Sequence, residues 1–597
     1  MRSEFSPDEN SAVLGVVRSF SGRFWRYRKI DNILASAITQ RLNLPDILGR
    51  VLAARNVCLD EAPNYLDPQL KHIMPDPSVI KDMDLAAEKL SEAVINRKKI
   101  AVFGDYDVDG ATSAALLQRY FSAVGSVLEL YIPDRVKEGY GPNIDALLKL
   151  KKQNVEIVIT VDCGTSSYEA IEAANEEGLK VIVVDHHIAE FKLPSALAVV
   201  NPNRFDEENS DLKSLAAVGV TFMLVVAINR CLRKKEWFVK RNEPDIRKWL
   251  DLVALGTICD AVPLKMLNRT FVLRGLEIMK MRNNPGIAAL ADIGKVKQKL
   301  NSYHLGFVLG PRVNAGGRVG RSDLGARILS TEDEKEAKNI AIQLDNFNIE
   351  RRAIEHQVQK EALKSIESKK LAKDPIIVVY GLNWHQGVIG IVASRLVEKF
   401  GKPVFVLSHD GKIVKGSGRS VNSFDIGALV LAAKQTQLLI NGGGHPMAAG
   451  LTVAFDNLVS LINFFISRAK DLESSIVASN FLEIDSLVSV DGANVELAKL
   501  LEQAGPYGQG NPSPRLVICN ANVLNTYQFG EDHISCILSS PSGSRVRAVA
   551  FRSLEKDLGR ALISSKGKNL HLAGKLQIDT WNGRNDVQFI IDDAITV

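Results

Sequence analysis

Three acidic residues stand at alternate positions in the segment GDYDVDG (104–110), namely Asp105, Asp107 and Asp109. Carboxylates this close repel one another, and a divalent cation would remove that cost. The flanking glycines allow the backbone to turn. A calcium loop of the EF-hand type is disfavoured, because Leu116 stands where such a loop, counted from Asp105, needs a glutamate.

Other acids and histidines follow apolar runs further along the chain. Asp162 follows the run 157–161, the triplet Asp185-His186-His187 follows 181–184, and Asp260 ends the run 252–259. We expect all of these runs to be strands of one parallel sheet. Ligands of such sheets collect at the carboxyl ends of the strands, so the side chains are predicted to converge on one crevice. A single aspartate after a strand more often caps a helix, but the repetition favours a site.

Carboxylates with one histidine suit Mn²⁺ or Mg²⁺ better than Zn²⁺, because hard oxygen ligands dominate. The six cysteines form no CxxC pair and indicate neither a zinc site nor a disulfide framework. The number of acids implies two ions. A two-metal site holds a phosphate, activates water and stabilises the leaving oxygen, so phosphoester hydrolysis is the predicted reaction class.

The elements that carry these residues follow a recognisable order. Apolar runs at 100–103, 157–161, 181–184 and 198–200 alternate with helical segments, which predicts βαβ units. Thr331 and Glu334 fit a capping box at the start of one long helix. A further α/β segment begins with a strand at 376–380, and closely spaced strand-like runs after residue 515 predict a β-barrel of OB type.

The predicted domains are an N-terminal extension (1–75), a metal-binding α/β domain (76–330), a connecting helix (331–371), a second α/β domain (372–478) and an OB-type domain (479–597). The length agrees with several domains, because 597 residues are too many for a single hydrophobic core. Hydrophobic content of 46% and charged content of 24% are ordinary for a soluble protein. No membrane-spanning run or secretory signal is recognisable, so we expect a cytoplasmic protein.

A net charge of +5 does not by itself indicate a nucleic-acid partner. The segment 18–28 mixes arginines with aromatic residues. Such an arm could stack on bases and neutralise phosphates, or it could dock on the protein body. The sequence leaves both interpretations open.

The strings DYDVDG, VDCG, VDHH and GTICDAVPL, in this order, resemble the DHH phosphoesterase superfamily. Further strings resemble the RecJ exonuclease family within it: GPRVNAGGR (310–318), WHQGVIG (384–390), GSGRS (416–420), GGGH (442–445) and PYGQGNP (506–512). This resemblance extends over nearly the whole chain from about residue 16. It implies hydrolysis of single-stranded DNA from the 5′ end to mononucleotides, in DNA repair and recombination, with two Mn²⁺ or Mg²⁺ ions.

The resemblance also implies roles for single residues. The metal-binding positions are Asp105, Asp107, Asp109, Asp162, His186 and Asp260, with Asp162 bridging the ions and Asp105 the least certain ligand. His187 would face the scissile phosphate. The substrate-binding positions are Arg135, Arg312, Asn314, Arg318, Arg395, Ser417, Arg419 and His445.

Within this set, Arg135, Ser417 and Arg419 resemble a pocket for the terminal phosphate, which guanidinium groups bind through a bidentate fork. Asn314, Arg318 and His445 would hold the strand near the cut. Alternatively, Arg318 pairs with Asp323 at the surface.

Two rival functions stay open at this point. One is a related phosphoesterase acting on short oligonucleotides, cyclic dinucleotides or pyrophosphate, and the other is an inactive relative that serves as a replication scaffold. The extra barrel argues against the first rival and the intact acids against the second. Expected partners are single-stranded DNA, a single-strand-binding protein and a RecQ-type helicase. No membrane partner is expected, and the expected oligomeric state is a monomer.

Overall fold

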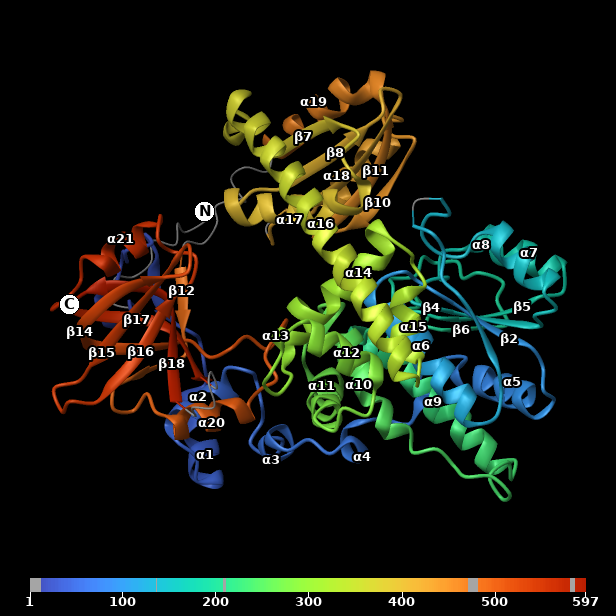
Figure 1. Cartoon of the computed structure of the whole chain (residues 1–597), viewed down its shortest axis with the longest axis horizontal. Helices are drawn as coiled ribbons and strands as arrows, with labels where there is room; N and C mark the ends of the chain where they lie inside the picture. Colours follow the sequence, from blue (N-terminus) through green and yellow to red (C-terminus); the bar gives the residue numbers. More distant parts are fainter. Residues whose placement is uncertain (1–11, 136, 208–210, 423, 471–480, 580–585) are drawn as a thin grey trace.

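The computed structural model describes residues 12–135, 137–207, 211–422, 424–470, 481–579 and 586–597. They form three bodies (Figure 1): an α/β body that carries the acidic motifs, a second α/β body and a β-barrel. This architecture confirms the predicted fold class. Among the described residues, no helix combines the length and the apolar character needed to cross a bilayer.

The sheet of the first α/β body, which carries the acidic motifs, has five parallel strands in the order β3-β2-β4-β5-β6. Their bounds are β2 (Ile100–Gly104), β3 (Leu128–Tyr131), β4 (Ile157–Val161), β5 (Lys180–Val184) and β6 (Ala198–Val200). Sequence reasoning missed β3, an edge strand that is only partly buried. The other four strands were predicted, and β2 and β4 are buried along their whole length.

Helices cover both faces of this sheet. On one face lie α5 (Met83–Ile95), α6 (Val108–Ala123) and α9 (Ala217–Lys234); on the other lie α7 (Ile144–Lys152) and α8 (Tyr168–Glu176). Burial on both faces explains why the central strands are continuously apolar rather than alternating.

The run that ends in Asp260 is a helix, so the prediction of a strand there is wrong. α10 spans Leu250–Cys259, and Asp260 is its C-cap. An apolar run of this length fits a helix buried on every side as well as it fits a central strand, and pattern alone does not separate the two. α10 packs against α6, α9 and α11 (Met266–Met279).

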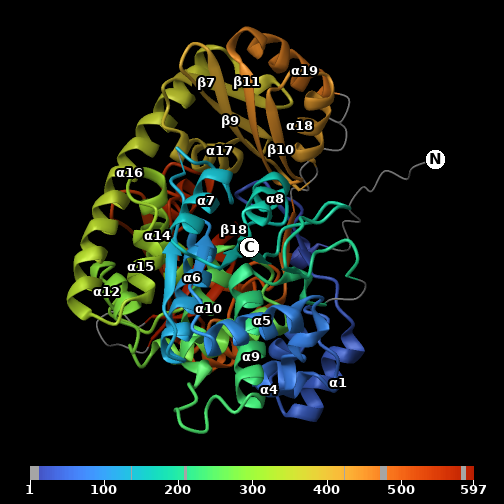
Figure 2. The ribbon, with the colours of Figure 1, turned by 90° about the vertical axis from the view of Figure 1, so that its right-hand side faces the viewer.

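Shorter elements connect this core to the long helix: α12 (Pro285–Ile293), α13 (Ser302–His304), the π-helical turn η6 (Leu305–Leu309), α14 (Gly310–Val319) and α15 (Leu324–Ser330). The long helix α16 (Glu334–Ser368) then runs to the second α/β body (Figure 2). Its N-cap is Asp333, so the capping box predicted for Thr331 and Glu334 is wrong. The Thr331 hydroxyl instead donates to Glu336.

The second α/β body has a sheet in the order β10-β11-β9-β8-β7. The strands are β7 (Ile377–Leu382), β8 (Val404–His409), β9 (Ile413–Arg419), β10 (Asn441–His445) and β11 (Ala448–Ala454). β7 and β8 are parallel and the other pairs are antiparallel. α16 and α17 (Gln386–Phe400) cover one face; α18 (Ile426–Gln435) and α19 (Leu458–Lys470) cover the other.

The barrel closes through the pairings β14–β15, β15–β16, β16–β18, β18–β17 and β17–β14. Its strands are β14 (Leu516–Phe529), β15 (His533–Ser539), β16 (Arg545–Ala550), β17 (Asn569–Asp579) and β18 (Asp586–Thr596). β13 (Ser486–Val488) pairs with β14, and α20 (Val495–Gln503) and α21 (Asp557–Ile563) pack against the barrel. A closed five-stranded barrel is the predicted OB type.

The basic aromatic arm docks on the barrel, as one of its two interpretations requires. β1 (Phe24–Tyr27) pairs in parallel with β12 (Phe481–Ile484). Trp25 is fully buried, and its Nε1 donates to Asp593 at 3.0 Å. Arg28 forms ion pairs with Glu483 and Asp485.

After this arm, four helices lead from the barrel to the first α/β body (Figure 1): α1 (Asn32–Leu42), α2 (Asp46–Ala53), α3 (Ala62–Leu66) and α4 (Leu70–Ile73). The predicted domain boundaries stay predictions, and the one at residue 478 lies outside the described residues.

Candidate metal centre and nucleic-acid cleft

Carboxylates and histidines from separate elements gather at the carboxyl edge of the first sheet. Three groups have ligand atoms that lie within 4.8 Å of one another: Asp105 with Asp107 and Asp162, Asp109 with His186 and Asp260, and Asp162 with His186 and His187. Asp162 and His186 each belong to two groups. The structure therefore brings together all six residues predicted to bind metal, with His187 beside them.

The loop after β2 orients Asp107 and Asp109. Asp107 is the N-cap of α6, and its Oδ1 accepts the N–H groups of Asp109 at 2.8 Å and Gly110 at 3.0 Å. A β-carbon at Gly110 would lie 2.4 Å from the Asp105 carbonyl oxygen, so only glycine fits there. The buried Asp109 carboxylate accepts the first two N–H groups of α9 at 2.6 and 2.9 Å, where the helix dipole favours a negative charge.

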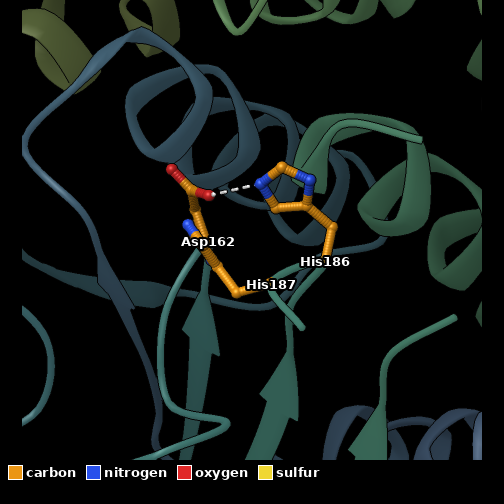
Figure 3. A group of neighbouring side chains, drawn as sticks. All are labelled: Asp162, His186 and His187. Atoms are coloured by element: carbon orange, nitrogen blue, oxygen red, sulfur yellow. Dashed lines mark ion pairs between the residues drawn. The ribbon is translucent and has the colours of Figure 1, made fainter. Parts of the chain in front are cut away.

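Asp162 and His186 point toward each other (Figure 3), with 3.3 Å between Oδ1 and Nε2. Asp162 has a φ of 61°, a left-handed conformation that is uncommon outside glycine and concentrates at functional sites. His186 Nδ1 lies 3.0 Å from the carbonyl oxygen of Leu215, which can only accept, so Nδ1 carries the proton. The unprotonated Nε2 is left facing carboxylates, with Asp260 at 3.7 Å and Asp109 at 4.0 Å. A lone pair surrounded by acids fits a bound cation between them.

The electrostatics also fit cations. Burial and the charge of Asp107 raise the pKa of Asp105 to about 8. Burial and neighbouring carboxylates raise the pKa of Asp109 and of Asp162 well above the ordinary value. Among the described residues, the buried oxygens Asp105 Oδ1 and Asp260 Oδ2 have no hydrogen-bond partner. Two hard cations would satisfy these oxygens and offset the repulsion.

His187 is held by Asp185 rather than by the acids around His186. Its Nδ1 lies 2.8 Å from Asp185 Oδ1, and the buried Asp185 also accepts the N–H groups of His186, His187 and Thr165. Burial lowers the pKa of His187, but the hydrogen bond and charge of Asp185 outweigh it and raise the pKa to about 8. With 52% of its side chain exposed, His187 can donate a proton to an anionic ligand in the cleft.

A groove between the two α/β bodies adjoins the acids and is lined by Arg135, Arg318, Ser417 and Arg419. Burial, together with repulsion from Arg135 and Arg351, lowers the pKa of Arg318 to about 10. Arg419 Nη1 lies 3.1 Å from Ser417 Oγ, and burial and Arg135 lower its pKa. Guanidinium groups this close repel one another unless an anion binds between them, so the cluster indicates an anion site. A planar guanidinium can donate two parallel hydrogen bonds, a geometry that suits phosphate.

Family models match three parts of the chain. The N-terminal domain of the DHH family matches residues 99–257, the DHHA1 domain matches 373–471, and the RecJ OB domain matches 484–593. These segments fall in the first α/β body, the second α/β body and the barrel, respectively. Because it holds the metal centre, the first α/β body is called the catalytic body below.

Curated relatives cover most of the chain. The single-stranded-DNA-specific exonuclease RecJ of Bacillus subtilis is 32% identical over 583 residues, which are 96% of this chain and 70% of the relative. The protein of the same name from Escherichia coli is 35% identical over 568 residues, which cover 92% of this chain and 96% of the relative. The chain belongs to the RecJ family. The resemblance seen in the sequence is thereby confirmed.

Two solved RecJ structures from Thermus thermophilus share the fold. The complex with Mn²⁺ has a TM-score of 0.78 and 26% identity, covering 96% of this chain and 79% of that one. The complex with Mg²⁺ has a TM-score of 0.72 and 25% identity, covering 96% and 78%. The prediction of Mn²⁺ or Mg²⁺ as the metal of this RecJ protein is confirmed by these complexes together with its own ligand set.

Two of the predicted substrate-binding arginines of this RecJ protein are engaged inside the protein. Arg312 donates through Nε to Asp345 at 2.9 Å, and Arg395 donates through Nε to Glu355 at 2.8 Å. Both acids belong to α16, so these ion pairs join α14 and α17 to the long helix. Neither arginine lines the groove described above.

Of the other predicted residues, Arg318 lines the groove, whereas Asn314 and His445 are not among its lining residues. Asn314 lies one turn before Arg318 on α14 and is half-buried. Arg318 donates to the carbonyl of Gly387 at 2.9 Å, whereas Asp323 pairs with other arginines, so the surface pairing of Arg318 with Asp323 is wrong. His445 ends β10, and burial together with Arg419 and His187 lowers its pKa.

Sequence reasoning missed Tyr140 in the cleft. Its hydroxyl donates to the carbonyl of Asp162 at 3.0 Å and lies 3.5 Å from His187 Nδ1. Gly139 and Gly141 on either side have positive φ values, so the tyrosine projects from a tight turn. The Gly-Tyr-Gly string close to Arg135 was the available signal.

Proposed function

We propose that this RecJ-family protein removes nucleotides one at a time from the 5′ end of single-stranded DNA and releases 5′-mononucleotides. The observation that carries the proposal is that a two-cation donor set and an arginine-lined groove adjoin in one cleft. The relatives named for this activity support the substrate, and the OB-type barrel supports a single-stranded polymer rather than a small molecule.

The metal ligands in this proposal are Asp107, Asp109, Asp162, His186 and Asp260, with Asp105 as a further donor and Asp162 as the bridge. Two ions held in this way lower the pKa of water and stabilise the leaving oxygen. Asp185 keeps His187 oriented and charged, so that the imidazolium donates to the scissile phosphate. Because its pKa is about 8, His187 carries this proton at neutral pH.

Direction of cleavage follows from where the phosphate is held. Arg135, Ser417 and Arg419 bind the 5′-terminal phosphate in the groove, and Asn314, Arg318 and His445 contact the backbone beside the cut. The arginine-lined groove and the adjoining acids support this assignment. For Arg312 and Arg395, the ion pairs with α16 favour a positioning role over contact with DNA.

A direct assay separates this function from its rivals. The protein is incubated with Mn²⁺ and with end-labelled single-stranded DNA, duplex DNA, a short oligoribonucleotide and pyrophosphate. Release of mononucleotides from single strands of many lengths is the expected result. Hydrolysis confined to dinucleotides or pyrophosphate would favour the small-molecule phosphoesterase, and binding without turnover would favour the scaffold.

We propose DNA repair and recombination as the setting of this activity, as the family resemblance implies, and the cytoplasm as its location, as the sequence predicted. A single-strand-binding protein and a RecQ-type helicase are the proposed partners, because both supply or cover single strands. The proposed oligomeric state is a monomer. Co-purification with the two partners and light scattering in solution test these statements.

A further inference from the structure

Two exposed aromatic rings lie together on the surface of the catalytic body. Tyr303 is 62% exposed and Phe307 is 68% exposed. Their rings are stacked, with centroids 5.2 Å apart and planes 26° apart. The residues are four apart on α13 and η6, which places them on the same helical face. We call this pair the aromatic platform.

The aromatic platform adjoins the metal centre. The π-helical turn that carries Phe307 packs against the end of α10, where Cys259 Sγ donates to the carbonyl of Leu305 at 3.5 Å. A β-carbon at Gly306 would lie 3.4 Å from Ile258. The next residue after Cys259 is the candidate ligand Asp260. Single-turn π-helical segments are frequent at functional sites, which agrees with this position.

The same region faces the barrel. Leu264, in the loop that follows Asp260, donates its N–H to the carbonyl of Gln509 at 2.7 Å. Lys299 is one of two lysines whose charge acts on Glu502, at the end of α20. Figure 1 likewise shows α13 at the edge of the catalytic body nearest the barrel.

The direction of a bound strand connects these observations, if the function proposed above holds. Arg135 lies over the Tyr106 ring, 4.9 Å from its centroid, and Tyr106 stands between Asp105 and Asp107, so the arginine groove lies beside the group that contains these two acids. Asp260 belongs to a different group, with Asp109 and His186. A strand with its 5′ phosphate among the arginines therefore passes the acids and leaves on the Asp260 side, toward the aromatic platform.

The charge around the platform suits the same ligand. Lys295, Lys297 and Lys299 precede α13 and are all exposed. Lysines neutralise phosphates, and aromatic faces stack on any base, which gives sequence-tolerant binding of single strands. We propose that Tyr303 and Phe307 stack on bases of single-stranded DNA on the 3′ side of the cut, between the metal centre and the barrel.

The test measures binding without hydrolysis. In EDTA, fluorescence anisotropy gives the Kd for a 5′-phosphorylated oligo-dT strand of about 20 nucleotides labelled at its 3′ end, long enough to reach from the cleft to an OB-type barrel. The double variant Tyr303→Leu/Phe307→Leu should bind about 10- to 100-fold more weakly, the loss expected for one or two base–aromatic stacks. The matched control Tyr303→Phe/Phe307→Tyr keeps both rings and should bind within about twofold of the wild type. Equal Kd values for the wild type and the leucine variant would overturn the proposal.

Abasic substrates provide a second measurement that does not depend on the variants folding. Strands that lack a single base at successive positions from the 5′ end are bound to the wild type. One or two adjacent positions should each weaken binding about tenfold, and the leucine variant should lose that dependence on position. A uniform or absent effect along the strand would overturn the platform.

The two proposals fail in different assays. Absence of nucleotide release with Mn²⁺ contradicts the exonuclease, whereas the platform is judged by binding in EDTA. If the leucine variant changes the oligomeric state in light scattering while DNA binding stays the same, the rings are a protein contact and the platform proposal is wrong.

Discussion

Nε2 of His186 lies 3.3 Å from Oδ1 of Asp162, and Nδ1–H of the same ring donates a hydrogen bond to the carbonyl of Leu215. This arrangement fixes the tautomer, so an unprotonated nitrogen faces a buried acid. An ionised Asp162 that faces the Nε2 lone pair is unfavourable, and a cation between them would remove that cost. The two side chains therefore belong to a metal site whose ligands are already in position in the metal-free protein.

Asp162→Asn tests the bridging role. Asparagine keeps the shape of the side chain and tolerates the left-handed backbone at this position. Turnover with Mn²⁺ should fall by more than about 100-fold, because a shared ligand of both ions loses its charge. The Tm in EDTA should rise, since one buried negative charge is removed. Asp60→Asn, at an exposed acid, is the control and should change neither quantity. Full turnover in the Asp162 variant would exclude the bridge.

Metal binding should depend on pH. The pKa of Asp105 is raised to about 8, so in the metal-free protein this carboxyl holds a proton at neutral pH. Because the folded pKa exceeds the unfolded value of about 3.9, metal-free stability should decrease as pH rises from about 4 through about 8. Mn²⁺ should bind more tightly at pH 8 than at pH 6 and release protons, which calorimetry in two buffers measures. Asp105→Asn should reduce the proton release; an unchanged release would contradict the assignment.

The sequence predicted which acids lie together better than it predicted which partners the arginines have, for a physical reason. Asp107, Asp162 and the Asp185 triplet follow central strands, and the parallel topology alone brings strand ends to one edge. Asp260 reached the same site although its run is a helix, because an apolar run of that length is equally compatible with both structures. The apolar-run pattern linked Asp260 to the other acids on the wrong assumption of a strand, and the motif strings made the same link without that assumption.

The acids that pair with Arg312 and Arg395 could not be predicted from local sequence spacing. Arg312 finds Asp345 across 33 positions of sequence, and Arg395 finds Glu355 across 40. Which acid a guanidinium meets depends on how α16 lies against its neighbours, and no local spacing encodes that packing. Trp25 is a further case, because its partner Asp593 lies near the other end of the chain.

The buried carboxyl group of Asp251, which lies outside the acid cluster, should make the stability of the protein depend on pH. Burial raises its pKa to about 6, against an unfolded value near 3.9. Ionisation in the folded state then costs about 3 kcal/mol, a cost absent below pH 4 and complete above pH 6. Asp251→Asn keeps the bond from the Leu252 N–H and should raise the Tm at pH 7.5 but not at pH 4.

Asp76 is the matched control of opposite sign. Bonds from Ser78 and Arg230 lower its pKa to about 2. Its contribution is present above the unfolded pKa and is lost as pH falls toward 2, so Asp76→Asn should lower the Tm at pH 7.5. Parallel shifts of both variants would show that the pKa directions do not control stability here.

Arg419→Ala should weaken recognition of phosphorylated ends selectively. Its guanidinium lies beside Ser417 in the groove, and a charge-assisted hydrogen bond contributes about 2 kcal/mol. KM for 5′-phosphorylated single strands should rise roughly 30-fold, with less than about threefold change for 5′-hydroxyl strands. Arg321→Ala removes an exposed arginine paired with Asp323 and serves as the control. An equal loss on both kinds of end would show that Arg419 holds the backbone rather than the terminal phosphate.

Arg312 and Asp345 should behave as one structural unit rather than as a DNA contact. Their side chains are 11% and 20% exposed, and Arg312 also donates to the carbonyl of Val308 at 2.7 Å, so the guanidinium is already occupied. Arg312→Ala and Asp345→Ala should each lower the Tm and the free energy of unfolding. The loss of unfolding free energy in the double variant should be smaller than the sum of the two single losses, with a coupling energy of about 1 kcal/mol. Both single variants should also change KM for single-stranded DNA by similar factors, because each loosens α16 against α14. If Arg312 instead binds the strand directly, Arg312→Ala alone will weaken DNA binding, and Asp345→Ala will leave the affinity at the wild-type value. Arg352→Ala, at an exposed arginine on the same helix, controls for the loss of a positive charge.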